Sequence, residues 1–245
     1  MVKKNQKPQR NVMTLEGQMA AIGVMVSAAT LSQREIDAVD IETVLVEMIT
    51  AIAREGASLR LPTLLLSWVA EHGGAVIVEK LQRLLVERKR SGEDVSVTAL
   101  CAQFAGRCGH KRWAPLVKRF APRTTRYLGP RELAESLVRL RGKENWADGS
   151  GFVVPSGSLE TSTKWVLSQS SLAKLSRQYQ NRLVFGAQWR ADIITAIQRG
   201  ARTPAEISRM SGASYEPCYR VNLELGLAGW PDIALRPEGN GHKVA

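Results

Sequence analysis

A chain of 245 residues with 44% hydrophobic and 23% charged residues has the balance of an ordinary globular protein with one large or two modest domains. Its longest apolar stretch, residues 61–70, is interrupted by Pro62 and Ser67 and is too short to span a membrane. The low aromatic content and the abundance of Ala, Leu and Arg favour a mainly helical protein.

The formal net charge of +11 is concentrated in the middle third of the chain. Residues 80–143 contain 16 Lys and Arg against 5 Asp and Glu, whereas residues 1–79 contain 7 against 9 and residues 144–245 contain 11 against 9. Clustered positive charge attracts polyanions by neutralising phosphates and releasing counterions. The middle third therefore contacts nucleic acid or forms a solvated surface without a partner. The candidate phosphate-binding residues are Arg112, Lys118, Arg119, Arg123 and Arg126.

Residues 1–32 are predicted to form a basic tail and a first helix. Four basic residues precede the apolar run 19–29, an order that resembles a secretory signal, but Glu16 and Gln18 interrupt the approach to that run. An odd set of three cysteines argues against a disulfide framework and for a reducing, cytoplasmic location.

Successive helices are predicted over residues 33–141, as a helical bundle or a short α-solenoid-like domain. Apolar residues recur at three- and four-residue spacing over residues 41–52, and Gly56 ends that helix. Basic residues at 88–90 suit a helix C-terminus, which carries partial negative charge. Further helices are predicted at 62–71, 76–90, 95–107, 111–120 and 131–140.

Residues 142–185 form a predicted connector. Glycines and a proline between 142 and 157 surround the apolar stretch 152–154, a pattern that indicates a short strand or a small β-hairpin. A single helix is predicted at 170–183, and the domain boundary is placed near residue 185.

Residues 186–245 are predicted to form a C-terminal, winged helix-turn-helix domain with a flexible tail. After a helix at 189–198, Thr203 and Glu206 form a capping box around Pro204, whose missing amide is no loss in a first helical turn. Ser208 supplies a small residue at the helix crossing, and Gly212 falls at the turn, where a left-handed backbone is required.

The third helix of this unit is predicted to begin after Ser214, which would cap it. Apolar side chains at Cys218 and Val221 would hold the helix against the other two. The residues predicted to complete a small core or a reduced wing are Leu223, Leu225, Leu227 and Trp230.

The recognition helix of such a unit enters the major groove with its N-terminus first. Arginine can donate two hydrogen bonds to guanine, a carboxylate can accept from cytosine, and tyrosine bonds phosphate or packs on base edges. The predicted base-reading residues are Tyr215, Glu216, Tyr219 and Arg220, and the predicted phosphate contacts around them are Gln188, Arg190, Arg202 and Arg209.

The stretch YQNRLVFGAQWRADIITA at residues 179–196, with the helix-turn-helix after it, resembles predicted regulators of bacteria and their mobile elements. Their genes lie beside AbiE-type nucleotidyltransferase toxins, where they act as antitoxin and repressor. The resemblance covers mainly residues 140–230. It implies autorepression of a toxin–antitoxin operon and a neighbouring nucleotidyltransferase toxin as a partner. Better-known AbiE antitoxins share an N-terminal winged helix, whereas the module here is C-terminal.

The sequence therefore predicts a DNA-binding regulator, with its own operator as the double-stranded DNA partner and a homodimer as one form. The alternatives are an RNA-binding or ribosome-associated protein that uses residues 80–143, and a protein-interaction scaffold. Catalysis, a metal and a cofactor are not expected. Cys101, Cys108 and His110 lack a fourth ligand at a suitable spacing, and the histidines, including His72 and His242, lie in Gly-containing surroundings typical of loops or tails.

Overall fold

The computed structural model describes residues 13–26, 30–55 and 58–230, and these residues are mainly helical, as the composition predicts. They form thirteen α-helices and one sheet of two short strands. None of these helices has the length and apolar character needed to cross a bilayer. The start of the predicted basic tail, residues 1–12, and the predicted C-terminal tail from residue 231 lie outside the described residues.

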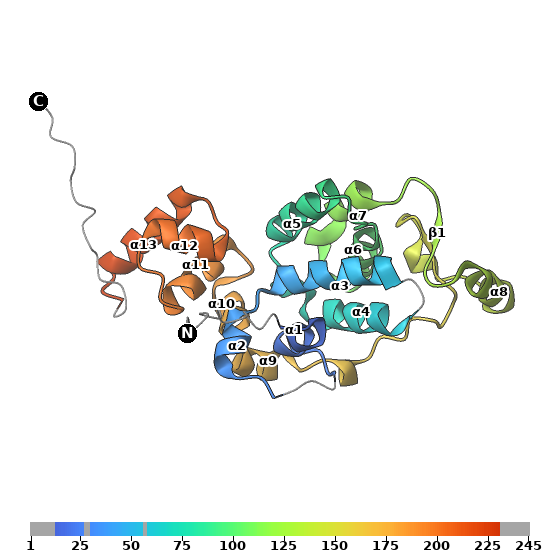
Figure 1. Cartoon of the computed structure of the whole chain (residues 1–245), viewed down its shortest axis with the longest axis horizontal. Coiled ribbons are helices and arrows are strands. Elements are labelled where there is room, and N and C mark those ends of the chain that lie inside the picture. Colours follow the sequence, from blue (N-terminus) through green and yellow to red (C-terminus); the bar gives the residue numbers. More distant parts are fainter. Residues whose placement is uncertain (1–12, 27–29, 56–57, 231–245) are drawn as a thin grey trace, which may run out of the picture.

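A long helix, α3 (Ile41–Glu55), lies at the centre of the larger of the two hydrophobic cores. This helix, α3, packs against α1, α4, α5 and α6, and α6 in turn packs against α7 (Figure 1). Its apolar stripe is buried as the spacing predicts, from Ile41 to Ile52. The helices are α1 (Leu15–Ala21), α2 (Gln33–Ala38), α3 (Ile41–Glu55), α4 (Arg60–His72), α5 (Val78–Arg90), α6 (Val97–Arg107) and α7 (Ala114–Phe120).

Two fully buried tryptophans tie α4 to its neighbours. The indole N–H of Trp68 donates to the Ile22 carbonyl at 2.7 Å, and that of Trp113 donates to the Gly73 carbonyl at 3.0 Å. Buried indoles of this kind contribute a large apolar surface while their single donor stays satisfied. The prediction that His72 lies in a loop is wrong, because α4 continues to this residue and its side chain is buried.

The predicted β-hairpin is also wrong. Strand β2 (Phe152–Val153) pairs in parallel with β1 (Arg126–Tyr127), which precedes α8 (Arg131–Arg141) in the chain. Parallel strands need a long crossover, and α8 with its flanking turns supplies it. The only antiparallel pairing of this stretch among the described residues is an isolated bridge between Lys143 and Pro155.

The single helix predicted at 170–183 is divided into α9 (Gln169–Leu175) and α10 (Arg177–Phe185). Ser176 lies between them in an extended conformation, and its side-chain oxygen accepts from the Tyr179 amide at 3.3 Å, which starts a new helix. The larger apolar core runs from Met19 to Tyr179. A second core, from Ile193 to Leu225, belongs to the last three helices.

Candidate nucleic-acid interface

The last three helices form a compact unit at one end of the molecule (Figure 1). They are α11 (Trp189–Gln198), α12 (Pro204–Ser211) and α13 (Tyr215–Leu227), and each packs against the other two. Ile193 and Ile197 from α11, Ile207 from α12 and Cys218 from α13 are all buried in the shared core. In this unit α12 and α13 are successive helices joined by a short turn, and α11 packs against both.

The start of α12 has the predicted cap. The Thr203 hydroxyl accepts from the Glu206 amide at 3.2 Å, and the Glu206 carboxylate accepts from the amides of Thr203 and Arg202 at 3.2 and 2.8 Å. The bonds from the Arg202 and Thr203 amides lower the pKa of Glu206, because they stabilise its charged form. This reciprocal cap fixes where α12 begins.

The turn between α12 and α13 depends on a left-handed glycine. Gly212 has φ of 75° and ψ of 4°, and its amide donates to the Ser208 carbonyl at 2.8 Å. The Ser208 hydroxyl donates to the Ala213 carbonyl at 2.7 Å, so this small residue also closes the turn. Ser214 occupies the N-cap position of α13 but forms no side-chain cap bond, contrary to the prediction.

The N-terminal half of α13 presents its four predicted base-reading side chains on one outward face. Tyr215 and Tyr219 are each 48% exposed, and their rings stack with centroids 6.4 Å apart. Arg220 pairs with Glu216 one turn earlier at 3.2 Å, and both side chains are exposed. The result is an outward patch of two aromatic rings beside one charged pair.

The C-terminal half of α13 corrects part of the predicted core. Leu225 is buried, but Leu223 and Leu227 are exposed, the latter at 77%. The helix continues through Leu227 instead of ending in a wing, so these two leucines lie on the outer face. Trp230 is half-buried and packs against the small core.

The predicted phosphate contacts around α13 have different surroundings. Gln188 is exposed at the N-cap position of α11, and Arg209 is exposed in the last turn of α12. Arg202 is exposed in the loop that enters α12. Arg190 pairs with Glu224 of α13 at 2.7 Å and so links the first helix of the unit to the third.

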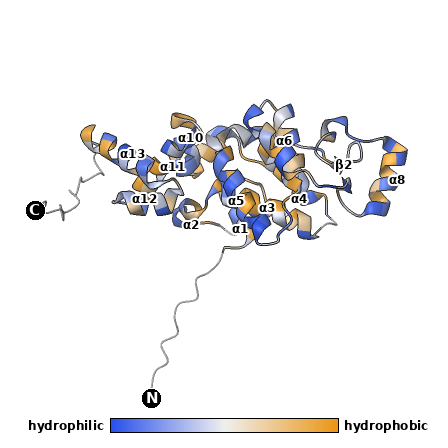
Figure 2. Cartoon of the chain, turned by 90° about the horizontal axis from the view of Figure 1, so that it is seen from above, coloured by the Kyte–Doolittle hydropathy of each residue, from blue (hydrophilic) through white to orange (hydrophobic). Residues whose placement is uncertain are grey.

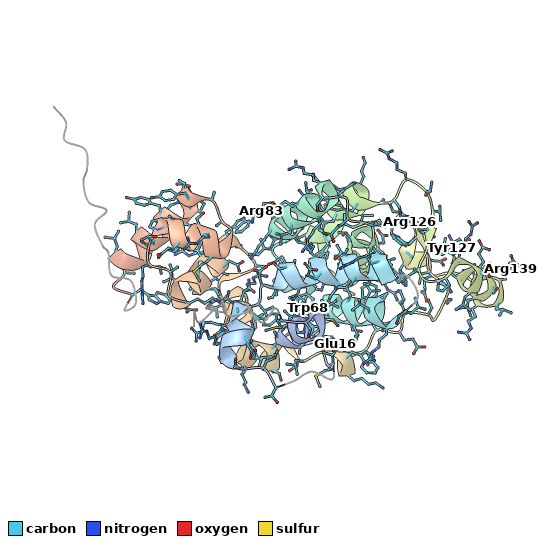
Figure 3. All side chains as sticks on the ribbon, viewed as in Figure 1. Glu16, Trp68, Arg83, Arg126, Tyr127 and Arg139 are labelled. Atoms are coloured by element: carbon cyan, nitrogen blue, oxygen red, sulfur yellow. The ribbon has the colours of Figure 1, made fainter. Side chains whose placement is uncertain are left out.

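The five candidate residues of the basic third also divide into two groups. Arg112 donates to the Ala187 carbonyl at 3.0 Å and pairs with Glu79, and Arg126, labelled in Figure 3, pairs with Asp94. These two arginines are therefore engaged within the protein. The other three, Lys118, Arg119 and Arg123, are exposed on α7 and just after it, and form no ion pair with any part of the chain that the structure describes.

Arg83 of α5 contacts the turn between α12 and α13, which the sequence did not predict. Its guanidinium donates to the Gly212 carbonyl at 2.7 Å and lies 5.2 Å from the centroid of the Trp189 ring (Figure 3). The turn between α12 and α13 is therefore held against α5, where the basic third of the chain begins. Nothing in the local sequence distinguishes Arg83 from the other basic residues of this amphipathic helix.

A buried cluster of charged side chains also fixes the last three helices to the larger core. The sequence did not predict this cluster. Arg182 of α10 pairs with Glu42 at 2.6 Å and with Asp192 of α11 at 2.9 Å. Lys80 of α5 lies 2.6 Å from Asp192 and also pairs with Asp40. The cluster thus joins α3 and α5 of the larger core to α10 and α11.

The pKa values in this cluster favour the charged forms. Burial alone would raise the pKa of Asp192, but the charges of Arg182 and Lys80 outweigh it and lower the pKa. Burial likewise opposes the charge of Lys80, yet Glu42 and the neighbouring aspartates raise its pKa. Asp192 is the one charged residue in a run of mostly apolar buried residues of α11, and such a charged residue requires a buried partner. This aspartate in an apolar run is the signal in the sequence that could have predicted the buried cluster.

The same three carboxylates, Asp40, Glu42 and Asp192, are the one group in the described ranges whose geometry could hold a metal ion, with ligand oxygens within 4.8 Å of one another. Two buried cations, Lys80 and Arg182, already lie among them. Protein groups therefore balance two of the three carboxylate charges, and the cluster fits an ionic connection better than a metal centre.

Comparisons of the chain with protein-family models, with curated proteins and with solved structures find no match. Function is therefore argued from the geometry of α11–α13 and from the charges around this unit.

Proposed function

We propose that this protein binds double-stranded DNA through α13 and acts as a transcriptional repressor. The observation that carries the proposal is the two-sided character of this helix. Cys218, Val221 and Leu225 face the core, while the opposite face at the N-terminal half carries the tyrosines and the charged pair. Helix-turn-helix proteins read base edges with that part of the recognition helix.

The side chains on this face suit base and phosphate contacts. The exposed guanidinium of Arg220 can form two hydrogen bonds with the O6 and N7 atoms of guanine. Its pairing with Glu216 limits its motion before DNA arrives, and Glu216 can accept from cytosine. Tyr219 offers a hydroxyl for phosphate and a ring edge for the thymine methyl group.

The basic third supplies the sequence-independent part of the proposed interaction. Because Arg83 holds the turn before α13 against α5, the recognition helix begins beside this region. Lys118, Arg119 and Arg123 then offer exposed positive charge to phosphates that flank the groove. The competing hypothesis is that the same three residues bind RNA. Titrations of a triple Gln variant with DNA and with RNA separate the two hypotheses.

The finer form of the proposal is autorepression of a toxin–antitoxin operon, with a nucleotidyltransferase toxin as the partner protein. Its support is the resemblance of residues 179–196. In this form the protein is cytoplasmic and performs no catalysis of its own. A wing beyond α13 would begin after Trp230, outside the described residues.

Arg220→Ala is expected to weaken specific DNA binding by about 1–3 kcal/mol, which is roughly 5- to 150-fold, because it removes a groove contact without touching the core. Electrophoretic mobility shift with the DNA upstream of the protein's own gene measures the change. Arg34→Ala, an exposed arginine on α2, is the matched control and should bind as the wild type does. Unchanged affinity in Arg220→Ala would remove this residue from the recognition surface, and absence of any wild-type shift would contradict autorepression.

Replacing Lys118, Arg119 and Arg123 together by Gln should weaken binding to operator and random DNA alike, because phosphates carry no sequence information. The slope of log affinity against log salt concentration should fall by up to about 3 units, close to one per lost phosphate contact. Titrations at several salt concentrations measure both quantities. An unchanged slope would mean a solvated face, and loss of RNA affinity with intact operator binding would favour the RNA-binding alternative.

A further inference from the structure

Helix α8 lies at the end of the molecule opposite the helix-turn-helix unit and projects from the larger core (Figure 1). It packs against β1, and the Arg131 guanidinium lies 5.9 Å from the centroid of the Tyr127 ring. Ala134 is the only buried residue of the helix. Most of its other residues are exposed, so much of the surface of α8 is open to a partner.

The open surface carries a seam of three leucines. Leu133 and Leu140 are 56% and 80% exposed, and Leu137 between them is half-buried. Their spacing of four and then three residues is the spacing of the apolar positions in a two-helix coiled coil. Figure 2 shows this apolar face along α8 at the tip of the molecule. A run of exposed leucines of this kind is typical of an interaction surface.

The charges beside the seam select a second copy of the same helix. Glu132 near the start of α8 and Arg139 near its end are two turns apart and so lie on the same flank of the leucines. In an antiparallel pair, Glu132 of each copy lies near Arg139 of the other, which gives two cross-helix attractions. In a parallel pair, the two-fold axis places these charges of the two copies on opposite sides of the leucine seam, so the two attractions are absent.

We propose that α8 pairs with α8 of a second copy in antiparallel orientation, about a two-fold axis near the middle of the helix. A helix of eleven residues is only about 16 Å long, so the pair buries less surface than a stable dimer of standard size. The dimer is therefore weak when the protein is free. If the proposed DNA binding holds, two helix-turn-helix units at the outer ends engage two separated half-sites, and DNA tethering strengthens the pairing.

Sedimentation equilibrium of the full chain without DNA tests the pairing independently of the proposed function. The wild type should show a concentration-dependent monomer–dimer equilibrium, and Leu133→Glu/Leu140→Glu should stay monomeric throughout the same series. The matched control is Val184→Glu/Leu227→Glu, which places the same charges at exposed apolar positions of α10 and α13 and should dimerise as the wild type does. Circular dichroism verifies that both variants are folded. A wild type that is monomeric at the highest concentration, or equal effects of the two double variants, would overturn the proposal.

A cysteine cross-link tests the orientation. In a Cys108→Ser background, where the two remaining cysteines are buried, Ser136→Cys places a thiol beside its own copy across the axis. Arg141→Cys places the thiol opposite Glu132 of the second copy, far from the other thiol. A short bis-maleimide should therefore produce a covalent dimer from Ser136→Cys and little from Arg141→Cys. Equal yields from the two variants would overturn the antiparallel arrangement, and no dimer from either would overturn the pairing.

Discussion

Replacing Arg182 with methionine is expected to lower the free energy of unfolding by about 3–5 kcal/mol, because it leaves two buried carboxylates without their main partner. The Arg182 side chain is fully buried between Glu42 and Asp192 and also donates to the Ala75 carbonyl at 3.0 Å. Burial opposes its charge, yet the two carboxylates outweigh this effect and raise its pKa. Without it, Lys80 alone would balance three acidic groups. Urea denaturation followed by circular dichroism measures the loss.

Arg177→Met is the matched control for this prediction. Arg177 lies on the same helix, but its side chain is exposed and makes one 3.3 Å bond to the Gln198 carbonyl. Its replacement should cost less than about 1 kcal/mol. The loss in Arg182→Met should also shrink when Glu42→Gln is added, because one unpaired buried charge is then removed. Equal losses for the two arginine variants would show that the cluster contributes little to stability.

The wild-type protein is expected to lose about 3 kcal/mol of stability as the pH falls from 6.5 to 4, because His72 is held neutral in the folded state. Its Nε2 donates to the Leu167 carbonyl at 2.9 Å, since that oxygen can only accept. Its Nδ1 therefore accepts from the Tyr179 hydroxyl at 2.8 Å. Burial lowers the pKa of His72 to about 4. The unfolded chain binds the extra proton between these pH values, so stability is complete above pH 6.5 and declines below it.

Urea titrations at half-unit pH intervals test this window. The buried carboxylates Asp40 and Asp192 have lowered pKa values, so their contribution to stability is lost only as the pH falls below the ordinary aspartate pKa, where the unfolded chain takes up the protons. His72→Gln should therefore be less stable than the wild type at neutral pH but nearly flat between pH 6.5 and 4. His110→Gln, at a half-buried histidine, is the control and should keep the wild-type slope. A slope that persists in His72→Gln would assign the window to other groups.

Local signals in the sequence were enough to predict the cap of α12 and the turn that leads into α13. The side chains of Thr203 and Glu206 each accept from the other residue's backbone amide, and Gly212 adopts the left-handed backbone conformation that its turn needs. The three- to four-residue spacing of apolar residues along α13 likewise places Cys218 and Val221 inward and Tyr219 outward. Each of these features depends on residues within one or two helical turns, which is the range that a sequence pattern describes.

The predictions that failed depended on partners far away in the chain. Glycines and a proline correctly indicated turns around β2, but its partner strand lies some 25 residues earlier, so a hairpin was the wrong choice. His72 is followed by two glycines that indicate a loop, yet its ring is buried through contacts with Leu167 and Tyr179. A turn residue indicates where the chain bends, but it does not indicate which distant residues pack against the bend.

By itself the sequence determined the helical composition, the cap and turn of the last three helices, and the outward face of α13. Only the tertiary structure decided how that unit is attached and which basic residues remain exposed. Arg182 and Glu42 are 140 residues apart in the chain, and Arg83 and Gly212 are 129 apart. Helix signals act over three or four residues, whereas buried ion pairs form only after packing brings distant helices together and removes the water between them.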